Sequence, residues 1–353
     1  MPLSPMLCKL ATALPPGDGW QFEPKWDGFR ALVFKDGDAL TLQSRDGKPL
    51  ERYFPELVAP LAAHLPPRIV LDGEIVIARG GALDFEALLL RIHPAASRVA
   101  TLARETPAAL VAWDLLALGD EDLRPLPQHA RRARLEATLA GLPPPILLTP
   151  VTRDRAVAAD WFHRFEGAGL DGVIAKPLEL PYRPGQRALV KVKHARTADC
   201  AVAGFRWYKD AVGERVGSLL LGLHDAAGQL HHVGVCATFT QAMRAQFATA
   251  LAPLAIDVAD HPWAGWQPEP DAAGRRPGMT SRWNRGKDLG WVPLRVERVC
   301  EVGYDHLQGA RFRHATQWKR WRDDRAPASC RYDQLEVTPP AELAALFAPV
   351  ASS

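Results

Sequence analysis

The stretch of sequence that decides the fold is KWDGFR, at residues 25–30. It places Lys25 two residues before an Asp-Gly pair and Arg30 two residues after the glycine. Glycine lets the backbone approach a ligand closely, and a guanidinium group offers a planar fork of hydrogen-bond donors. Such a loop is suited to presenting an amine to a phosphate. The short pattern also occurs in ordinary turns with an exposed lysine, so its neighbours along the chain must decide between the two interpretations.

Further short motifs follow in order along the chain. They are SRDG at 44–47, DGE at 72–74, WDLL at 113–116, DGVIAK at 171–176, KVK at 191–193 and RWRDDR at 320–325. Asp72 and Glu74 interrupt an apolar stretch, where carboxylates are costly unless they are used. Lys191 and Lys193 alternate along a predicted strand and therefore share one face. The series thus combines carboxylates with cations suited to phosphate chemistry.

The residues between these motifs predict strands mixed with a few helices in the first half. Apolar runs at 30–34 and 39–43 flank an Asp-Gly turn, which indicates a hairpin. The apolar patterns further predict strands at 68–78, 108–116 and 172–176 and helices at 128–140 and 154–166.

After His194 the character of the sequence changes. Short β-type runs at 201–207, 217–223, 231–236 and 296–304 predict a small all-β domain such as a barrel. The boundary is expected near residues 196–198. Residues 263–287 are rich in Pro, Gly and Arg and are expected to form an irregular loop, and the end from 339 a short helix or a frayed tail.

Composition narrows the class of protein. A chain of 353 residues suits two domains, and its 47% hydrophobic and 24% charged residues are typical of a soluble globular protein. No apolar run approaches the roughly 20 residues of a membrane span, and no signal peptide is recognised, so we expect a cytoplasmic protein. The five cysteines are odd in number and lack C-x-x-C spacing, which argues against a disulfide framework and a zinc site. The histidines at 93, 231, 232 and 314 likewise lack ligand spacing.

The net charge of +3 is unevenly distributed. Residues 275–325 hold 13 lysines and arginines against 6 acidic residues, a net charge of +7, so the remainder carries −4. A basic stretch of this kind is expected of a protein that binds a phosphate backbone, although charge alone is equally compatible with a solvated surface.

The ordered series resembles the covalent nucleotidyltransferase superfamily, which contains DNA ligases, RNA ligases and mRNA capping enzymes. The segments quoted above are similar to its motifs I, Ia, III, IIIa, IV, V and VI. Longer stretches, such as EPKWDGFR at 23–30, LDFEALLLRIHP at 83–94 and HARTADCAVAGF at 194–205, resemble the bacterial ATP-dependent ligases of the ligase C type and the ligase module of bacterial end-joining enzymes. The resemblance covers about residues 5 to 335.

This resemblance implies an α+β fold in two domains. Residues 1–196 would form an ATP-grasp-like nucleotidyltransferase domain of antiparallel sheets with flanking helices, and residues 197–353 an all-β OB-fold barrel. The implied activity is ATP-dependent sealing of nicks between a 3′-hydroxyl and a 5′-phosphate in duplex DNA, in DNA repair. It proceeds through a lysyl-AMP and a DNA-adenylate.

The resemblance also assigns roles to residues. Lys25 is the nucleophile that receives AMP. The ATP-binding residues are Glu23, Arg30, Arg45, Glu74, Trp113, Lys176, Lys191 and Lys193, with Arg45 at the nick phosphate and Trp113 stacked on adenine. Glu74 and Asp171 are the implied ligands of Mg²⁺ or Mn²⁺, and Arg322, Asp324 and Arg325 form a lid that closes over ATP and orients pyrophosphate. On pattern alone Trp113 is as readily a core aromatic, and Asp114 is expected to support the structure.

Three positions depart from the usual motifs. Asp171 stands where motif IV usually begins with Glu, which puts direct metal contact by this shorter side chain in doubt. Arg325 replaces a lysine and Trp113 a phenylalanine, and both keep the charge or the stacking area.

Other functions are alternatives to the ligase. Within the superfamily they are an RNA ligase or a capping guanylyltransferase, and outside it a non-catalytic OB-type nucleic-acid-binding protein. A P-loop ATPase is excluded because the sequence has no Walker A loop. NAD⁺ is not expected as the AMP donor, because the four-cysteine zinc module of NAD⁺-dependent ligases is missing. The expected partners are nicked double-stranded DNA and repair proteins, with no membrane, and the chain is expected to be a monomer associated with the nucleoid.

Overall fold

The computed structural model describes residues 3–194, 196–264, 290–305, 307–335 and Leu343. Contacts divide the chain into two compact units, Met1–His194 with the end of the chain, and Ala195–Val337. The boundary lies two residues from the division expected at 196. Leu343, which we expected in the second domain, instead packs in a core cluster of the first unit and donates its backbone N–H to the Gly81 carbonyl at 2.8 Å.

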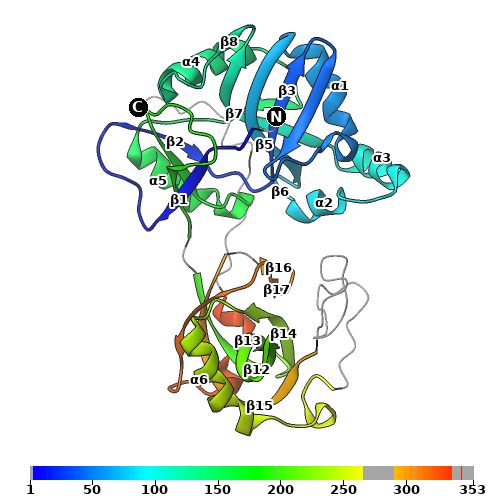
Figure 1. Ribbon diagram of the computed structural model, residues 1–353, viewed down its shortest axis with the longest axis vertical. Coiled ribbons are helices and arrows are strands. Elements are labelled where there is room, and N and C mark those ends of the chain that lie inside the picture. Colours follow the sequence, from blue (N-terminus) through cyan, green and yellow to red (C-terminus); the bar gives the residue numbers. More distant parts are fainter. Residues whose placement is uncertain (1–2, 195, 265–289, 306, 336–342, 344–353) are drawn as a thin grey trace. The chain divides into compact units, whose positions relative to one another are not determined.

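The first unit contains a large, mainly antiparallel sheet (Figure 1). Its strand order is β4 (Ala39–Ser44), β3 (Phe29–Asp36), β5 (Arg68–Arg79), β7 (Ala108–Leu118) and β8 (Glu121–Asp122), with β6 (Ala82–Leu83) pairing with β5 and β9 (Ile146–Leu148) running parallel to β7. The hairpin of β3 and β4 is the one that the Asp-Gly turn predicts, and Gly37 adopts a φ of 58° in that turn.

A second sheet of the first unit has four strands. Their order is β1 (Leu7–Ala11), β11 (Arg187–Val192), β10 (Val173–Pro177) and β2 (Trp20–Pro24). Strand β1 runs parallel to β11, and the other pairs are antiparallel.

Helices cover the outer sides of these sheets. They are α1 (Pro55–His64), α2 (Phe85–Leu90), α3 (Ala96–Glu105), α4 (Gln128–Leu139) and α5 (Arg155–Arg164), with 3₁₀ turns η1 (Glu51–Tyr53) and η2 (Glu166–Ala168). Leu61 of α1 and Leu135 of α4 lie in one buried apolar cluster with Leu71 and Ile75 of β5. The alternate residues of β5 face the opposite way, and Val76 joins a cluster with Phe22 and Val173 of the four-stranded sheet. The charged residues of the DGE motif therefore face the space between the two sheets.

The second unit is a closed sheet of five strands. The order is β14 (Leu230–Cys236), β13 (Ala211–His224), β12 (Arg196–Tyr208), β15 (Val292–Tyr304) and β18 (Gln317–Trp321). A parallel bridge between Cys236 and Thr316 joins the free edge of β14 to the residue that precedes β18, and so closes the barrel. This is the strand order of an OB-fold. The barrel that the β-type runs predict is confirmed, with α6 (Gln241–Leu251) inserted between β14 and β15 as a helix that the sequence pattern did not indicate.

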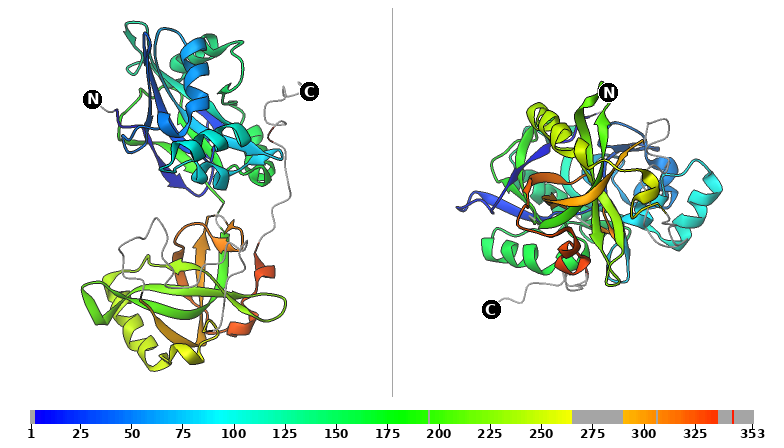
Figure 2. Two further views of the ribbon diagram at one scale, coloured as in Figure 1. Left: turned by 90° about the vertical axis from the view of Figure 1, so that its right-hand side faces the viewer. Right: turned by 90° about the horizontal axis from the view of Figure 1, so that it is seen from below.

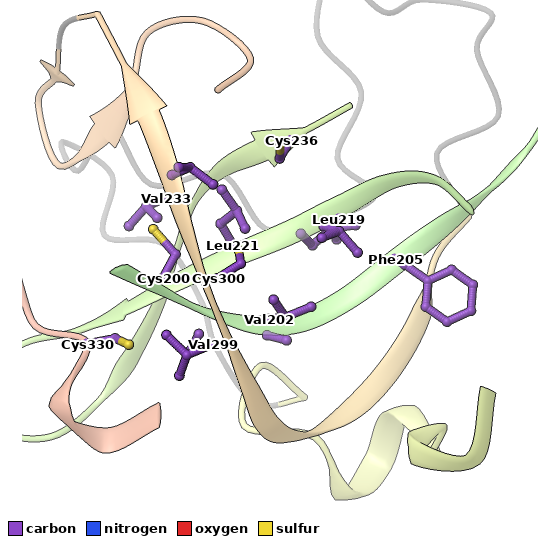
Figure 3. Close-up of a cluster of buried hydrophobic side chains, with 14 of the residues drawn as sticks. Cys200, Val202, Phe205, Leu219, Leu221, Val233, Cys236, Val299, Cys300 and Cys330 are labelled. Atoms are coloured by element: carbon purple, nitrogen blue, oxygen red, sulfur yellow. The ribbon is translucent and has the colours of Figure 1, made fainter. Parts of the chain in front are cut away.

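Smaller elements complete this unit, and its core is apolar. They are η3 (Ala252–Leu254), η4 (Val258–Asp260), β16 (Leu307–Gln308), β17 (Arg311–Phe312), η5 (Pro327–Ser329) and η6 (Tyr332–Gln334). Val202, Leu221 and Val299 meet in the core with the thiols of Cys200 and Cys300, which are register partners on β12 and β15 (Figure 3). Burial raises the pKa of both thiols well above its usual value, so they act as small apolar side chains.

The strands β12, β13 and β15 are long and curve through the barrel, as a second view shows (Figure 2). From residue 265 the loop expected at 263–287 lies outside the described residues, as does the end of the chain beyond 335 apart from Leu343. Among the described residues, no helix is both long enough and apolar enough to span a membrane.

Candidate active site

Lys25 lies in the loop between β2 and β3, and backbone hydrogen bonds fix this loop against the start of β10. The Lys25 N–H donates to the Gly172 carbonyl at 2.8 Å, and the Asp171 N–H donates to the Lys25 carbonyl at 2.9 Å. Gly172 has a φ of +127°, and a Cβ there would lie 2.0 Å from the Val192 carbonyl oxygen. The glycine of motif IV is therefore required for β10 and the end of β11 to approach the lysine loop.

The amine of Lys25 is paired with the carboxylate of Asp171. The same carboxylate forms a second ion pair, in which Asp171 Oδ2 lies 2.8 Å from Lys193 Nζ. Asp171 is buried, whereas the Lys25 side chain is 19% exposed. The structure thus places Asp171 between two lysines, which supports a role in holding the nucleophile, and its role as a metal ligand stays a prediction.

Gly28 of the KWDGFR loop packs directly on β5. A Cβ at this position would lie 2.2 Å from the Ile75 carbonyl oxygen and 2.9 Å from Glu74 Cγ. The Gly28 N–H donates to Glu74 Oε1 at 3.1 Å, so the loop and the DGE motif are in contact. The glycine of K-x-D-G is thus explained by a close backbone approach.

We expect Gly28→Ala to cost about 1–3 kcal/mol of stability, because the added methyl overpacks the backbone of β5. The displacement of Lys25 should lower the rate of lysyl-AMP formation as well. Thermal melting and single-turnover adenylation measure the two effects. Gly37→Ala is the control variant. A Cβ at Gly37 would meet no atom within 4 Å, so any fall in its melting temperature reports the strain of an alanine at positive φ and not overpacking. Adenylation by this variant should be unchanged.

A buried ion pair lies beside the lysine loop. Lys176 Nζ is 2.8 Å from Glu23 Oε2, and both side chains are 3% exposed. Gln21 Nε2 donates to Glu23 Oε1 at 2.9 Å. A buried ion pair is costly unless its remaining polar atoms are satisfied, and Gln21 satisfies one of them here.

Trp113 lies at a β-bulge. In the β5–β7 register Asp72 faces Asp114 and Gly73 faces Ala112, so Trp113 is the extra residue. Its ring lies 5.1 Å from the Arg30 guanidinium carbon and 5.9 Å from Lys176 Nζ. A bulge re-aims a side chain, and this one turns a half-buried indole toward the cations of the site.

Asp72 and Tyr182 hold Arg30 in place. Arg30 Nε and Nη2 donate to the two Asp72 oxygens at 2.8 and 2.5 Å, and the Tyr182 hydroxyl donates to Asp72 Oδ2 at 2.8 Å. Glu74 is the register partner of Arg30, and burial raises the pKa of Glu74 to about 8. The nearby charges of Arg30 and Lys25 act in the opposite direction on this pKa, so Glu74 is a carboxyl group set beside the cations of the site.

Lys191 completes the group of cations. Burial lowers the pKa of Lys191, and the nearby charges of Lys193 and Lys25 act in the same direction. The structure therefore brings three amines of motifs I and V together, which is the electrostatic setting expected of a polyphosphate site.

The remaining predicted residues lie elsewhere. Arg45 is exposed in the turn after β4. Arg322, Asp324 and Arg325 belong to the second unit, just after β18, where Arg322 Nη1 is 2.8 Å from Asp199 Oδ2. Asp114, expected to support the structure, forms a buried pair with Arg131, with Nε to Oδ1 at 2.8 Å, and so joins α4 to β7.

The described part of the chain offers no group of three or more His, Cys, Asp and Glu side chains that could hold a metal ion. A divalent cation bound at Glu74 would therefore draw most of its ligands from nucleotide phosphates and water. This is the usual coordination of Mg²⁺ in phosphoryl-transfer enzymes, so the residues present fit such an ion.

The chain that carries this site matches two known family models. The family model described as "ATP dependent DNA ligase domain" matches residues 5–193, more than half of the chain. The chain belongs to the ATP-dependent DNA ligase family. A second family model, described as "ATP dependent DNA ligase C terminal region", matches residues 212–325 of the ligase.

Individual relatives span the whole ligase. It is 55% identical over 341 residues to "DNA ligase C2" of Mycolicibacterium smegmatis, covering 96% of this chain and 95% of that one. It is 54% identical to "DNA ligase C" of Mycobacterium tuberculosis, covering 95% and 94%. The resemblance inferred from the motifs is confirmed, and the protein is an ATP-dependent DNA ligase that forms phosphodiester bonds. The alternatives of an RNA ligase, a capping enzyme and a non-catalytic binding protein are set aside.

A solved structure supports the fold. The structure titled "DNA binding with a minimal scaffold: Structure-function analysis of Lig E DNA ligases" matches the ligase with a TM-score of 0.55 at 16% identity, over 90% of this chain and 99% of that chain. At this identity the likeness concerns the fold alone, and it agrees with the expected α+β domain followed by an OB-fold.

Two contributors to the site were missed from the sequence. The sequence shows Asp72 only as part of a costly acidic pair, and the structure shows that it holds Arg30. Tyr182 lies in the loop after β10, where nothing in its sequence surroundings distinguishes it from other loop aromatics. Only the fold shows that these residues, 110 positions apart, share a hydrogen bond.

Proposed function

We propose that Lys25 carries the AMP of this DNA ligase. The observation that carries the proposal is the fixed loop that presents the Lys25 amine beside Asp171, Lys193 and Lys191. In the first step the amine attacks the α-phosphate of ATP, so that an N–P bond forms and the bond to pyrophosphate breaks. AMP then passes to the 5′-phosphate of a nick, and the 3′-hydroxyl finally displaces AMP.

Each step is a displacement at phosphorus, in which positioning and charge neutralisation lower the barrier. Arg30, held by Asp72 and Tyr182, and the lysines of motif V are placed to neutralise phosphate oxygens. Asp171 holds the Lys25 amine in the loop. A divalent ion, Mg²⁺ or Mn²⁺, would add positive charge at the phosphates, with Glu74 and Asp171 as its predicted protein ligands.

The adenosine part of ATP is assigned to the buried end of the site. Glu23 and Lys176 supply polar atoms fixed by their ion pair. The indole of Trp113, re-aimed by the bulge, supplies a face on which a purine can stack. Arg45, exposed after β4, is assigned to the phosphate at the nick.

The proposed function is tested by comparing strand joining with ATP or GTP and on nicked DNA or nicked RNA. The ligase should join nicked duplex DNA with ATP and should use GTP and nicked RNA poorly, as a gel assay of strand joining would show. Joining of nicked RNA as fast as nicked DNA would overturn the substrate assignment.

Nick, gap and blunt-end substrates, with and without cell extract, would test the role in repair that the resemblance to end-joining ligase modules suggests.

Binding to nicked DNA should depend steeply on salt. With a net charge of +7 over residues 275–325, about six phosphate contacts would lower affinity roughly 10³-fold between 50 and 200 mM salt, through counterion release. Fluorescence anisotropy on a labelled nick measures this. The slope should not change with the DNA sequence, because phosphate contacts carry no base information. A flat plot of log affinity against log salt would contradict the prediction.

The partners proposed for the chain are nicked DNA and repair proteins, and the chain itself acts as a cytoplasmic, nucleoid-associated monomer. All the motifs of the series occur within this one chain, so the proposal needs no second copy. Light scattering during size exclusion tests the monomer, with a dimer mass as the contradicting result.

A further inference from the structure

Asp199 is a nearly buried carboxylate in the first strand of the barrel. Its side chain is 11% exposed. Its backbone is held on both sides by Gln334, since the Asp199 N–H donates to Gln334 Oε1 at 2.8 Å and Gln334 Nε2 donates to the Asp199 carbonyl at 3.0 Å. Asp199 is therefore a fixed point, tied both to the strand ladder and to η6.

Two lid arginines converge on this carboxylate. Arg322 Nη1 donates to both Asp199 oxygens, at 2.9 and 2.8 Å, and Arg325 Nε lies 3.7 Å from Oδ2. The Arg322 N–H also donates to the Val299 carbonyl at 2.9 Å. Two guanidinium groups this close to one carboxylate would repel each other without its negative charge. The Asp199 carboxylate therefore allows Arg322 and Arg325 to lie near each other.

The two carboxylates bound to Arg322 are not equivalent. Asp324 accepts from Nε and Nη2, each at 2.8 Å, but its side chain is 63% exposed and it lies two residues away. Asp199 comes from another strand, 123 residues earlier, and is held by its own backbone contacts. Asp324 therefore covers the fork of Arg322 from solvent, whereas Asp199 determines where the guanidinium group is anchored.

We propose that Asp199 is a positioning residue for self-adenylation: it anchors Arg322 and Arg325 side by side, so that the Nε and Nη2 fork of Arg322 is presented to the pyrophosphate that leaves ATP. A guanidinium fork matches phosphate as well as carboxylate, so pyrophosphate can take the place that the exposed Asp324 occupies. Asp199 itself takes part in no bond change. This inference rests on the lid role assigned to the two arginines.

The test compares Asp199→Asn with Glu301→Gln. Glu301 is the register partner of Asp199 on β15 and pairs with Arg320 at 2.7 Å. Its amide variant removes a carboxylate charge near Arg322 but leaves the hydrogen bonds of Arg322 to Asp199 and Asp324 in place, so it controls for the loss of charge alone. In single-turnover assays Asp199→Asn should slow Lys25–AMP formation about 10- to 100-fold, the cost of a misplaced group. Sealing of a nick that is already adenylated should change less than about 3-fold by the same reasoning, and Glu301→Gln should match the wild type in both.

A second readout separates positioning from folding. Purified lysyl-AMP enzyme incubated with inorganic pyrophosphate should re-form ATP more slowly in Asp199→Asn, with a raised KM for pyrophosphate, and Asp199→Glu should restore part of the rate. Equal losses in adenylation and in sealing of the adenylated nick would overturn the proposal, as would normal adenylation. If the double arginine variant adenylates normally, the lid role itself fails; if it loses adenylation while Asp199→Asn keeps it, only the inference about Asp199 fails.

Discussion

Lys25→Ala is expected to abolish covalent labelling of the ligase by α-labelled ATP. The substitution removes the amine that attacks the α-phosphate, which the backbone contacts of residue 25 hold beside β10. Those contacts use main-chain atoms and survive the change, so the melting temperature should stay close to that of the wild type. The measurement is a denaturing gel after incubation with labelled ATP. Labelling of the variant at the wild-type level would contradict the assignment of Lys25 as the nucleophile.

Two further variants sharpen this test. Lys25→Arg keeps the positive charge beside Asp171 but should also fail, because a guanidinium group stays protonated and cannot act as the nucleophile. Lys209→Ala removes an exposed lysine of the second unit and should label normally. Loss of labelling in all three variants would point to damaged protein and not to a lost nucleophile.

Much of the candidate site could be predicted because its residues lie in short motifs on strands with a regular alternation of side chains. The alternation along β5 places Glu74 on the face opposite Leu71 and Ile75, and the order of the motifs fixes which strands carry the cations. Gly28 and Gly172 must be glycines, because a Cβ at either position would collide with the carbonyl oxygen of Ile75 or Val192. Here local sequence and tertiary structure agree.

Other features could not be read from the sequence because they depend on pairing between distant segments. The bulge that re-aims Trp113 exists only in the register of β7 against β5. The place of the Asp171 carboxylate between two lysines exists only because β10 folds against the Lys25 loop. The helix α6 has the weakly amphipathic sequence QAMRAQFATAL, and three of its residues, Phe247, Ala248 and Leu251, are buried against the barrel. Tertiary contacts decide each of these cases.

Replacing both Arg322 and Arg325 by alanine should separate the first step of ligation from the last. Pyrophosphate, with its several negative charges, leaves only in the first step, and AMP leaves in the last. A group accelerates only the step whose transition state it contacts. The double variant should therefore form lysyl-AMP at least about 10²-fold more slowly, the usual loss for one donor to a developing charge.

The same variant should still seal a nick supplied already adenylated, and single-turnover assays of the two steps make the comparison. It is a cleaner test than deletion of everything after Arg196, because the deletion also removes the basic stretch at 275–325 and takes Leu343 out of the core of the first unit. The double variant frees Asp199 as an unpaired carboxylate, which costs stability, so its melting temperature must be measured and Asp199→Asn added to relieve that charge. If the added Asp199→Asn restores the melting temperature but adenylation stays lost while sealing proceeds, the arginines act on the leaving pyrophosphate. If adenylation and sealing fall by the same factor, the arginines serve DNA binding or folding, and the lid role is wrong.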